Sequence, residues 1–133
     1  MEQRTIEDYC RIILKLDKGE GVRALDIRKG LNLSKITVSL TLQKLTHENY
    51  IKMKKYGKAK LAQKGIAIAE KMNFRHRVIE TFLVKVLKQD KEKVHEEAHK
   101  LEHAFSDYSI NKIYQILGKP KTGVHGEDIK EVN

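Results

Sequence analysis

Hydrophobic residues recur at helical spacing, every three or four positions, over most of this chain. The first such run consists of Ile6, Tyr9, Ile13 and Leu16. It predicts a helix over about residues 5–16, which Thr5 and Asp8 would begin as a capping box. The segment DKGEG then interrupts the pattern, and a short second helix is expected over about residues 22–30.

A third helix and a hairpin complete a known order of elements. Residues 32–34 favour a turn, and Ser34 is expected to cap a helix over about residues 35–49. The inward face of this helix would consist of Val38, Leu42 and Leu45. After it, β-favouring residues on both sides of Tyr56-Gly57 predict a β-hairpin. Helix, helix, turn, helix and a basic hairpin is the order of a winged helix-turn-helix domain.

The second half of the chain is also predicted to be helical, except at its end. The expected helices cover about residues 63–72, 75–87, 90–104 and 106–117. The final segment, GKPKTGVHGEDIKEVN, favours loops. The pattern therefore predicts a mainly α chain, with a winged helix-turn-helix domain at residues 1–72 and an all-helical domain at residues 73–133.

Length and charge narrow the class of protein. A chain of 133 residues can bury one core or two small ones, which excludes a large multidomain enzyme. Lys and Arg number 27 against 18 acidic residues, for a formal net charge of +9, so the protein attracts polyanions. Nucleic acid is the first partner to consider, although a basic surface can also be merely solvated.

The expected location is the cytoplasm. Cys10 is the only cysteine, which excludes an internal disulfide, and the segment MEQRTIEDYC lacks the features of a signal peptide. No stretch approaches the roughly 20 apolar residues that span a bilayer, so no membrane partner is expected.

Residues on the third helix and on the hairpin suit double-stranded DNA. Hydroxyls and cations that can meet base edges and phosphates occur off the inward helix face, at Ser34, Lys35, Thr37, Ser39 and Lys44. The same hydroxyls could simply cap and solvate the helix. Residues 49–69 contain no acid, and the hairpin carries Lys54, Lys55, Lys58 and Lys60. Lysines near phosphates add salt-dependent affinity without choosing a sequence.

The segment HEEAHKLEH, residues 95–103, places potential metal ligands on one helix face. At about 100° per residue, His95, His99, Glu102 and His103 fall within roughly 100° of the circumference. His76 and Glu80 form a second pair at i, i+4. Imidazole with carboxylate suits Mn²⁺, Fe²⁺, Co²⁺, Ni²⁺ or Zn²⁺. A lone histidine is better explained as a surface or core residue, but the cluster favours metal binding.

The segments TIEDY, RHRVIETFL and KVHEEAHKLEHAFS, in this order of elements, resemble the iron- and manganese-dependent repressors of the diphtheria toxin repressor family. The resemblance covers about residues 4–126, and PKTGVHG is similar to the family's Cys-Pro-His-Gly turn. It implies a winged helix, a helical dimerisation domain and metal sites. The chain resembles the short, two-domain form, without the SH3-like domain of longer members.

The resemblance also implies roles for individual residues. The family's principal site is matched by Asp8, His99, Glu102 and His103, and its ancillary site by His76, Glu80 and His95. Asp8, which the sequence alone explains as a helix cap, thus becomes a candidate ligand. His99 stands where iron repressors generally have cysteine and manganese repressors glutamate, and Arg11 replaces a glutamate of the manganese type. Gly123 stands where the turn often has cysteine, which leaves His125 as a weak candidate ligand from the tail.

The function predicted is that of a metal-dependent, DNA-binding transcriptional repressor of metal homeostasis genes, and not that of an enzyme. It would bind a pseudo-palindromic operator as a homodimer, with a divalent transition metal as corepressor. Fe²⁺ and Mn²⁺ are favoured, and Co²⁺, Ni²⁺ or Zn²⁺ could bind in vitro. The alternative is a metal-independent winged-helix regulator. A di-metal enzyme needs Glu-x-x-His twice, and the chain has it once, at Glu96 and His99.

Overall fold

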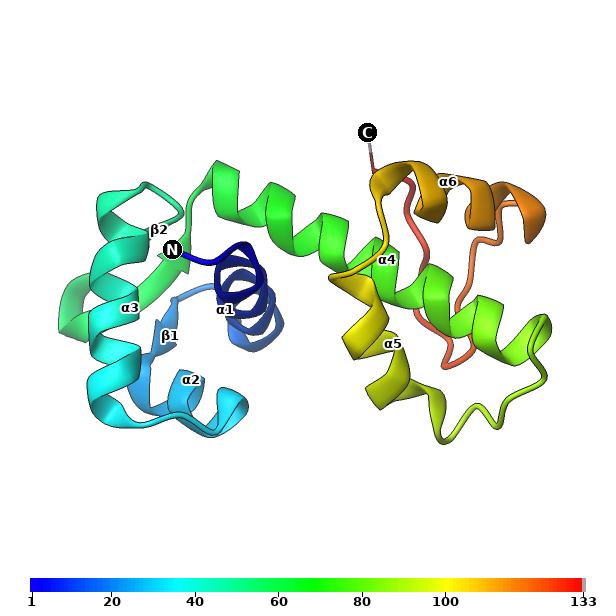
Figure 1. Cartoon of the computed structure of the whole chain (residues 1–133). Helices are drawn as coiled ribbons and strands as arrows, with labels where there is room; N and C mark the ends of the chain where they lie inside the picture. The colour runs from blue at the N-terminus through cyan, green and yellow to red at the C-terminus, as the bar shows by residue number, and fades with distance from the viewer. Residues whose placement is uncertain (133) are drawn as a thin grey trace. The chain divides into compact units, whose positions relative to one another are not determined.

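The computed structural model describes residues 1–132, which divide into two compact units (Figure 1). The first unit comprises Met1–Glu70, and the second begins at Lys71. Helix α4, Gln63–Lys85, begins in the first unit and ends in the second. Each unit buries its own cluster of hydrophobic side chains.

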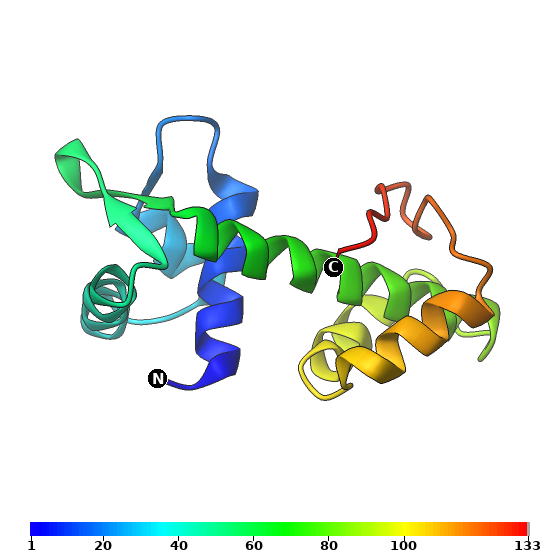
Figure 2. The same cartoon turned by 90° about the horizontal axis from the view of Figure 1, so that it is seen from above.

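The first unit is a winged helix-turn-helix, as predicted. Its elements before α4 are α1 (Gln3–Leu16), β1 (Val22–Arg23), α2 (Ala24–Leu31), α3 (Lys35–His47), β2 (Ile51–Met53), the short 3-10 turn η1 (Lys55–Gly57) and β3 (Lys58–Leu61). The strands pair antiparallel in the order β1-β3-β2, with Val22 opposite Ala59 and Ile51 opposite Leu61. The β2–β3 hairpin projects from the helices of this unit as the wing (Figure 2).

The turn of the wing lies where the sequence predicts it. Tyr56 and Gly57 both have left-handed backbone, with φ of 63° and 70°, which is the conformation that tight hairpin turns require. Glycine adopts it without steric cost. The Tyr56 side chain, 95% exposed, stands at the tip of the wing.

Two predictions in the first unit are wrong. α1 begins at Gln3, with Glu2 as N-cap and no side-chain cap, so Thr5 and Asp8 lie inside the helix and form no capping box. The Asp8 carboxylate instead lies 3.8 Å from Nε of Arg4, one helical turn earlier. The second predicted helix also starts two residues too early, because Val22 pairs with Ala59 of β3 and belongs to a strand.

The inward face of α3 is confirmed. Val38, Leu42 and Leu45 are buried among side chains from α1 and α2, including Ile13 and Ile27. The helix ends at His47, two residues earlier than predicted, and Asn49 after it has a left-handed φ of 67°. This core attaches one face of α3 and leaves the opposite face to solvent.

The second unit contains the rest of α4 together with α5 (Val94–Glu102) and α6 (Asp107–Ile116). The sequence predicts two helices, with a break between residues 72 and 75, where the structure has the single helix α4. No glycine or proline interrupts residues 66–85, and Phe74 at the expected break is buried in the core. α5 begins later than predicted, because Asp90 accepts a hydrogen bond from the Glu92 amide in a turn before the helix. None of the helices in residues 1–132 is long and apolar enough to cross a membrane.

The tail after α6 packs on the second unit. Ile129 is buried in a core that also contains Phe74, Val78, Ile79, Leu83, Val94, Ala98, Ile110 and Tyr114. Thr122 and Asp128 form an isolated β-bridge, and Nη1 of Arg77 on α4 donates to the Asp128 carbonyl at 2.7 Å. The tail is irregular, as predicted, but these contacts give it a defined place beside α4.

Candidate nucleic-acid interface and metal centre

The outer face of α3 presents hydroxyls and cations. Oγ of Ser34 accepts a hydrogen bond from the Thr37 amide at 3.2 Å and donates to Oγ1 of Thr37 at 2.9 Å. The predicted N-cap is therefore confirmed, and both side chains are exposed. Lys35, Ser39 and Lys44 are exposed as well. The polar residues that sequence reasoning selected thus remain accessible on a helix anchored by its other face.

The lysines of the wing fall into two groups. Lys54 and Lys55 are exposed near the hairpin tip. Lys58 lies 3.7 Å from the Glu20 carboxylate, and Lys60 lies 3.5 Å from that of Asp17 and donates to the Gly19 carbonyl. The second group therefore ties the loop before β1 to the sheet. A DNA contact for any of these four lysines stays a prediction.

The predicted ligands of the second unit come from two helices. α4 supplies His76 and Glu80, α5 supplies His95, His99 and Glu102, and His103 follows as the C-cap of α5. His76, Glu80 and Glu102 are buried, with exposed fractions of 3%, 1% and 0%. Carboxylates at such depth are costly unless cations or hydrogen-bond donors surround them.

Three histidines surround the buried carboxylate of Glu80. Its Oε2 lies 3.2 Å from Nε2 of His76, 3.7 Å from Nδ1 of His95 and 3.5 Å from Nδ1 of His125. Burial by itself would raise the pKa of the Glu80 carboxyl. The hydrogen bond and charge of His76, with the charges of His125 and His95, outweigh it and lower that pKa below its ordinary value. Glu80 is thus held as an anion inside a ring of imidazoles.

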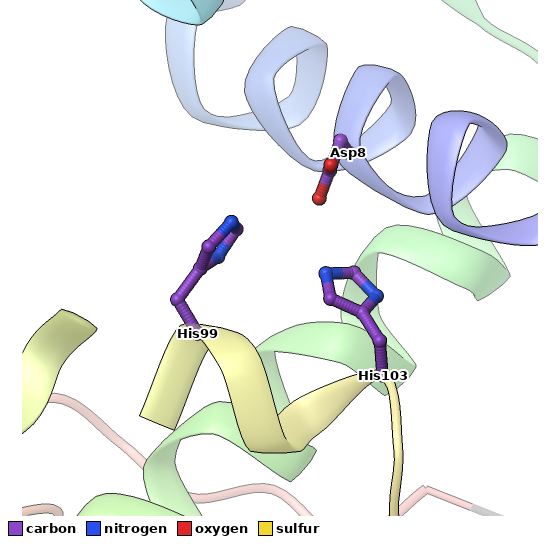
Figure 3. A group of neighbouring side chains, drawn as sticks. All are labelled: Asp8, His99 and His103. Atoms are coloured by element: carbon purple, nitrogen blue, oxygen red, sulfur yellow. The ribbon is translucent and has the colours of Figure 1, made fainter. Parts of the chain in front are cut away.

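Glu102 joins this ring to a second group of histidines. Its Oε2 lies 2.8 Å from Nδ1 of His76, whereas Oε1 lies 2.8 Å from Nδ1 of His99 and 3.7 Å from Nε2 of His103. His99 and His103 project from the same side of α5 (Figure 3), with their rings edge to face at 5.4 Å. The one-face arrangement predicted for residues 95–103 is therefore present within this unit.

Arg75 braces the end of α5. This buried guanidinium donates to the main-chain carbonyls of Glu102 and Phe105, and it pairs with Asp107 at 2.8 Å. A cation at a helix C-terminus satisfies carbonyls that lack helical partners. Lys71 also bonds to Asp107, and this hydrogen bond lowers the pKa of the Asp107 carboxyl. The brace fixes the backbone that carries Glu102 and His103.

The tail adds two residues that could ligate a metal. Ligand atoms of Glu80, His125 and Glu127 lie within 4.8 Å of one another, and Nε2 of His125 lies 2.8 Å from the Lys91 carbonyl. Sequence reasoning gave His125 little weight and did not select Glu127. No helix or strand spacing indicated these two residues, because residues 124–126 form a turn in which Gly126 has a left-handed φ of 87°.

Asp8 lies on α1 in the first unit (Figure 3). Its side chain is 26% exposed and pairs with Arg4. Its role as a metal ligand stays a prediction.

The donor set of the second unit fits a divalent first-row metal. Ligand atoms of His76, Glu80 and His95 lie within 4.8 Å of one another, and two of these residues are buried. Imidazole and carboxylate donors suit Mn²⁺, Fe²⁺, Co²⁺, Ni²⁺ and Zn²⁺ alike. Cys10, the only thiol, is buried in the core of the first unit. A histidine-carboxylate site is thus the type that this chain can build.

Two family models match the chain. The model described as "Iron dependent repressor, N-terminal DNA binding domain" matches residues 1–59, and "Iron dependent repressor, metal binding and dimerisation domain" matches residues 62–131. The chain belongs to the iron-dependent repressor family. The family resemblance and the mainly helical fold expected from the sequence are confirmed. The histidine-carboxylate cluster lies in the part matched by the metal-binding and dimerisation domain.

Individual relatives agree with this assignment. An uncharacterised HTH-type transcriptional regulator of Methanocaldococcus jannaschii is 33% identical over 123 residues, which cover 91% of this chain and 98% of that protein. MntR, an HTH-type transcriptional regulator of Bacillus subtilis, is 32% identical over 118 residues, or 88% and 82% of the two chains. A solved manganese-dependent transcriptional repressor in complex with manganese matches 95% of this chain with a TM-score of 0.85 and 31% identity. This chain spans 58% of the length of that repressor's chain.

Proposed function

We propose that this member of the iron-dependent repressor family is a transcriptional repressor that binds its operator when a divalent metal, Mn²⁺ or Fe²⁺, is bound. The observation that carries the proposal is the buried pair of carboxylates, Glu80 and Glu102, each facing histidines of the second unit. Relatives named as manganese-dependent repressors support the choice of metal. The chain would act in the cytoplasm and without enzymatic activity.

Two groups of residues would hold the metal. One consists of His76, Glu80, His95 and the tail residue His125, and the other of Glu102, His99, His103 and Asp8. A bound divalent cation supplies the positive charge that holds deprotonated carboxylates and neutral imidazoles together. The first group is supported by its convergent distances. Asp8 is included because the family resemblance implies it.

Metal would control DNA binding by shifting a population of domain arrangements. Asp8 belongs to the DNA-binding domain, whereas His99 and His103 belong to the metal-binding and dimerisation domain. An ion that takes ligands from both domains favours whichever arrangement it binds better. In a homodimer, that arrangement sets the spacing of two α3 helices, which must match half-sites about one helical turn of DNA apart.

The DNA contacts would come from α3 and from the wing. α3 would enter the major groove and place its exposed hydroxyls and cations, Ser34, Lys35, Thr37, Ser39 and Lys44, near bases and phosphates. The wing lysines, Lys54, Lys55, Lys58 and Lys60, would add affinity through phosphate contacts. The net charge of +9 favours the same partner.

A metal-independent winged-helix regulator is the competing function. In such a protein the histidines would serve only as structural partners of buried groups. A structural role for Glu80 needs one or two donors, yet three imidazoles approach the same oxygen within 3.7 Å. This excess of ligand atoms around one buried anion favours metal binding.

The deciding experiment measures operator affinity with and without metal. The purified dimer is titrated onto fluorescent DNA from its own promoter in chelator, in Mn²⁺, in Fe²⁺ without oxygen, in Co²⁺ and in Zn²⁺. We expect operator affinity to rise at least tenfold with one or more metals. Glu80→Gln and His99→Ala should reduce this rise. Glu97→Gln, an exposed change on the same helix as His99, should leave it intact. Tight operator binding that persists in chelator would establish the metal-independent function instead.

A further inference from the structure

Helix α3 carries aliphatic side chains on two opposite faces. Its inner face is buried, but Ile36 and Leu40 are 73% and 54% exposed. At about 100° per residue, these two lie roughly 40° apart and on the side of the helix opposite Val38, Leu42 and Leu45. Residues four apart are neighbours on a helix surface. Ile36 and Leu40 therefore form one exposed aliphatic ridge, which the core of the first unit does not use.

The ridge is surrounded by polar and cationic groups. Gln43 and His47 continue the same face, and both are exposed. Lys35 and Ser39 stand on one side of the ridge, and Thr37 and Lys44 on the other, by the same helical geometry. An aliphatic centre between cations complements a partner that has apolar groups between rows of negative charge.

Duplex DNA has this distribution of groups. Its major groove is bordered by phosphates, and the C5-methyl of thymine is the apolar group that unmodified base pairs present there. Aliphatic side chains offer no hydrogen bond, so they can recognise a base only by such contact. A protein partner would also need a continuous apolar patch, whereas this ridge is narrow and flanked by lysines.

We infer that Ile36 and Leu40 determine operator specificity by packing against thymine methyl groups in the major groove. The inference rests on the proposed function and adds to it the chemistry of the bases that are read. Four residues of helix advance about 6 Å, close to two base-pair steps of about 3.4 Å. Each operator half-site therefore has two thymines, on either strand, within two or three base pairs of each other.

The test replaces thymine by deoxyuridine, which removes the methyl group and keeps the base pair. Operator duplexes are selected from a random-sequence pool by the full-length protein in saturating Mn²⁺, and affinities are measured by fluorescence anisotropy. Each deoxyuridine at a contacted position should weaken binding about fourfold, the cost of one methyl left unburied. Deoxyuridine at thymines outside the half-sites should change affinity less than twofold.

Variants assign the effect to the ridge. Ile36→Ala and Leu40→Ala should bind the thymine operator several-fold more weakly, and each should lose its sensitivity to deoxyuridine at one position. Leu87→Ala is the matched control, because Leu87 is 51% exposed and lies in the second unit. It should bind like the parent protein and keep the full deoxyuridine effect. All three changes are at exposed positions, and a thermal melt by circular dichroism checks the fold.

Three results would overturn the inference. The first is selected half-sites without paired thymines, and the second is an operator affinity that deoxyuridine does not change. The third is that ridge variants change the oligomeric state while DNA affinity stays constant. The last result would assign the ridge to a second copy or to another protein. In all three cases metal-dependent DNA binding can persist, so the proposed function survives. If the protein binds no DNA in any metal, both the proposed function and this inference fail.

Discussion

Nδ1 of His76 lies 2.8 Å from Oε2 of Glu102, and both side chains are buried. A carboxylate beside Nδ1 favours the tautomer in which that nitrogen carries the proton. With a metal bound beside Glu80, Nε2 of His76 would then offer its lone pair to the ion. In metal sites, a carboxylate at one ring nitrogen orients the histidine whose other nitrogen binds the ion, and Glu102 would orient His76 in this way. Through its other oxygen, Glu102 also faces His99.

Glu102→Gln should weaken metal binding at both histidine groups. The change keeps the size of the side chain and removes the charge that orients His76 and accompanies His99. Loss of such a carboxylate typically lowers metal affinity about 10- to 100-fold. Isothermal titration with Co²⁺ or Mn²⁺ measures the effect. Glu97→Gln, an exposed change on the same helix, is the control, and equal affinities in the two variants would contradict the bridging role of Glu102.

Metal should stabilise the folded chain, because the unfolded chain lacks the convergent ligands. Mn²⁺ at about 100 times its dissociation constant should add about 2.7 kcal/mol per site to the free energy of unfolding. Thermal melts in Mn²⁺ and in chelator measure this shift by circular dichroism. Glu80→Gln should reduce it, whereas identical melts of the parent protein in both buffers would show that the cluster binds no Mn²⁺.

Ile129→Ala should destabilise the second unit. Ile129 is the tail residue buried in the core beside α4, and replacing a buried isoleucine by alanine costs about 2–5 kcal/mol. Urea denaturation measures this loss, and Lys130→Ala, which changes an exposed neighbour, should stay within about 0.5 kcal/mol of the parent. Because the same tail carries His125, metal affinity should also fall. If Ile129→Ala left the free energy of unfolding unchanged, the tail would not pack on the core of the second unit.

The double variant Lys54→Ala/Lys55→Ala should reduce the salt dependence of operator binding. Each lysine that contacts a phosphate contributes about 0.9 to the slope of log K against log salt concentration. The slope should therefore become shallower by about 2 for each bound subunit, while the preferred sequence is unchanged. Lys100→Ala, on α5, is the control. If the double variant lost more affinity for one operator sequence than for all others, the wing would recognise bases as well as phosphates.

Cys10 should resist alkylation in the folded protein. Burial, with a smaller effect of the Glu7 charge, raises the pKa of its thiol to about 12, so the reactive thiolate is scarce at pH 8. We expect iodoacetamide to leave the native chain unmodified and to add one group per chain in guanidinium chloride. Mass spectrometry counts the groups. Similar rates in both solvents would show that the core around Cys10 opens readily.

The tertiary structure decided where several elements begin and end. Val22 joins a strand because β3 offers it a partner, and α4 runs unbroken because Phe74 is buried among residues that lie far from it in sequence. The conformational propensities of neighbouring residues cannot predict either contact, because both contacts join residues that are distant in the sequence. In the same way, Glu80 and His125 are brought together by the packing of Ile129, and no spacing rule relates residues from a helix and a distant tail.

What the sequence by itself determined is what short-range periodicity encodes. The spacing of apolar residues predicted the buried face of α3, and the order of elements with the Tyr56-Gly57 turn predicted the wing. The interval from His95 to His103 placed the candidate ligands of α5 on one face, because a helix repeats every 3.6 residues wherever it packs. Only the folded chain decided that Glu80 and Glu102 would be buried among those histidines, since burial depends on the packing of α4 against α5 and the tail.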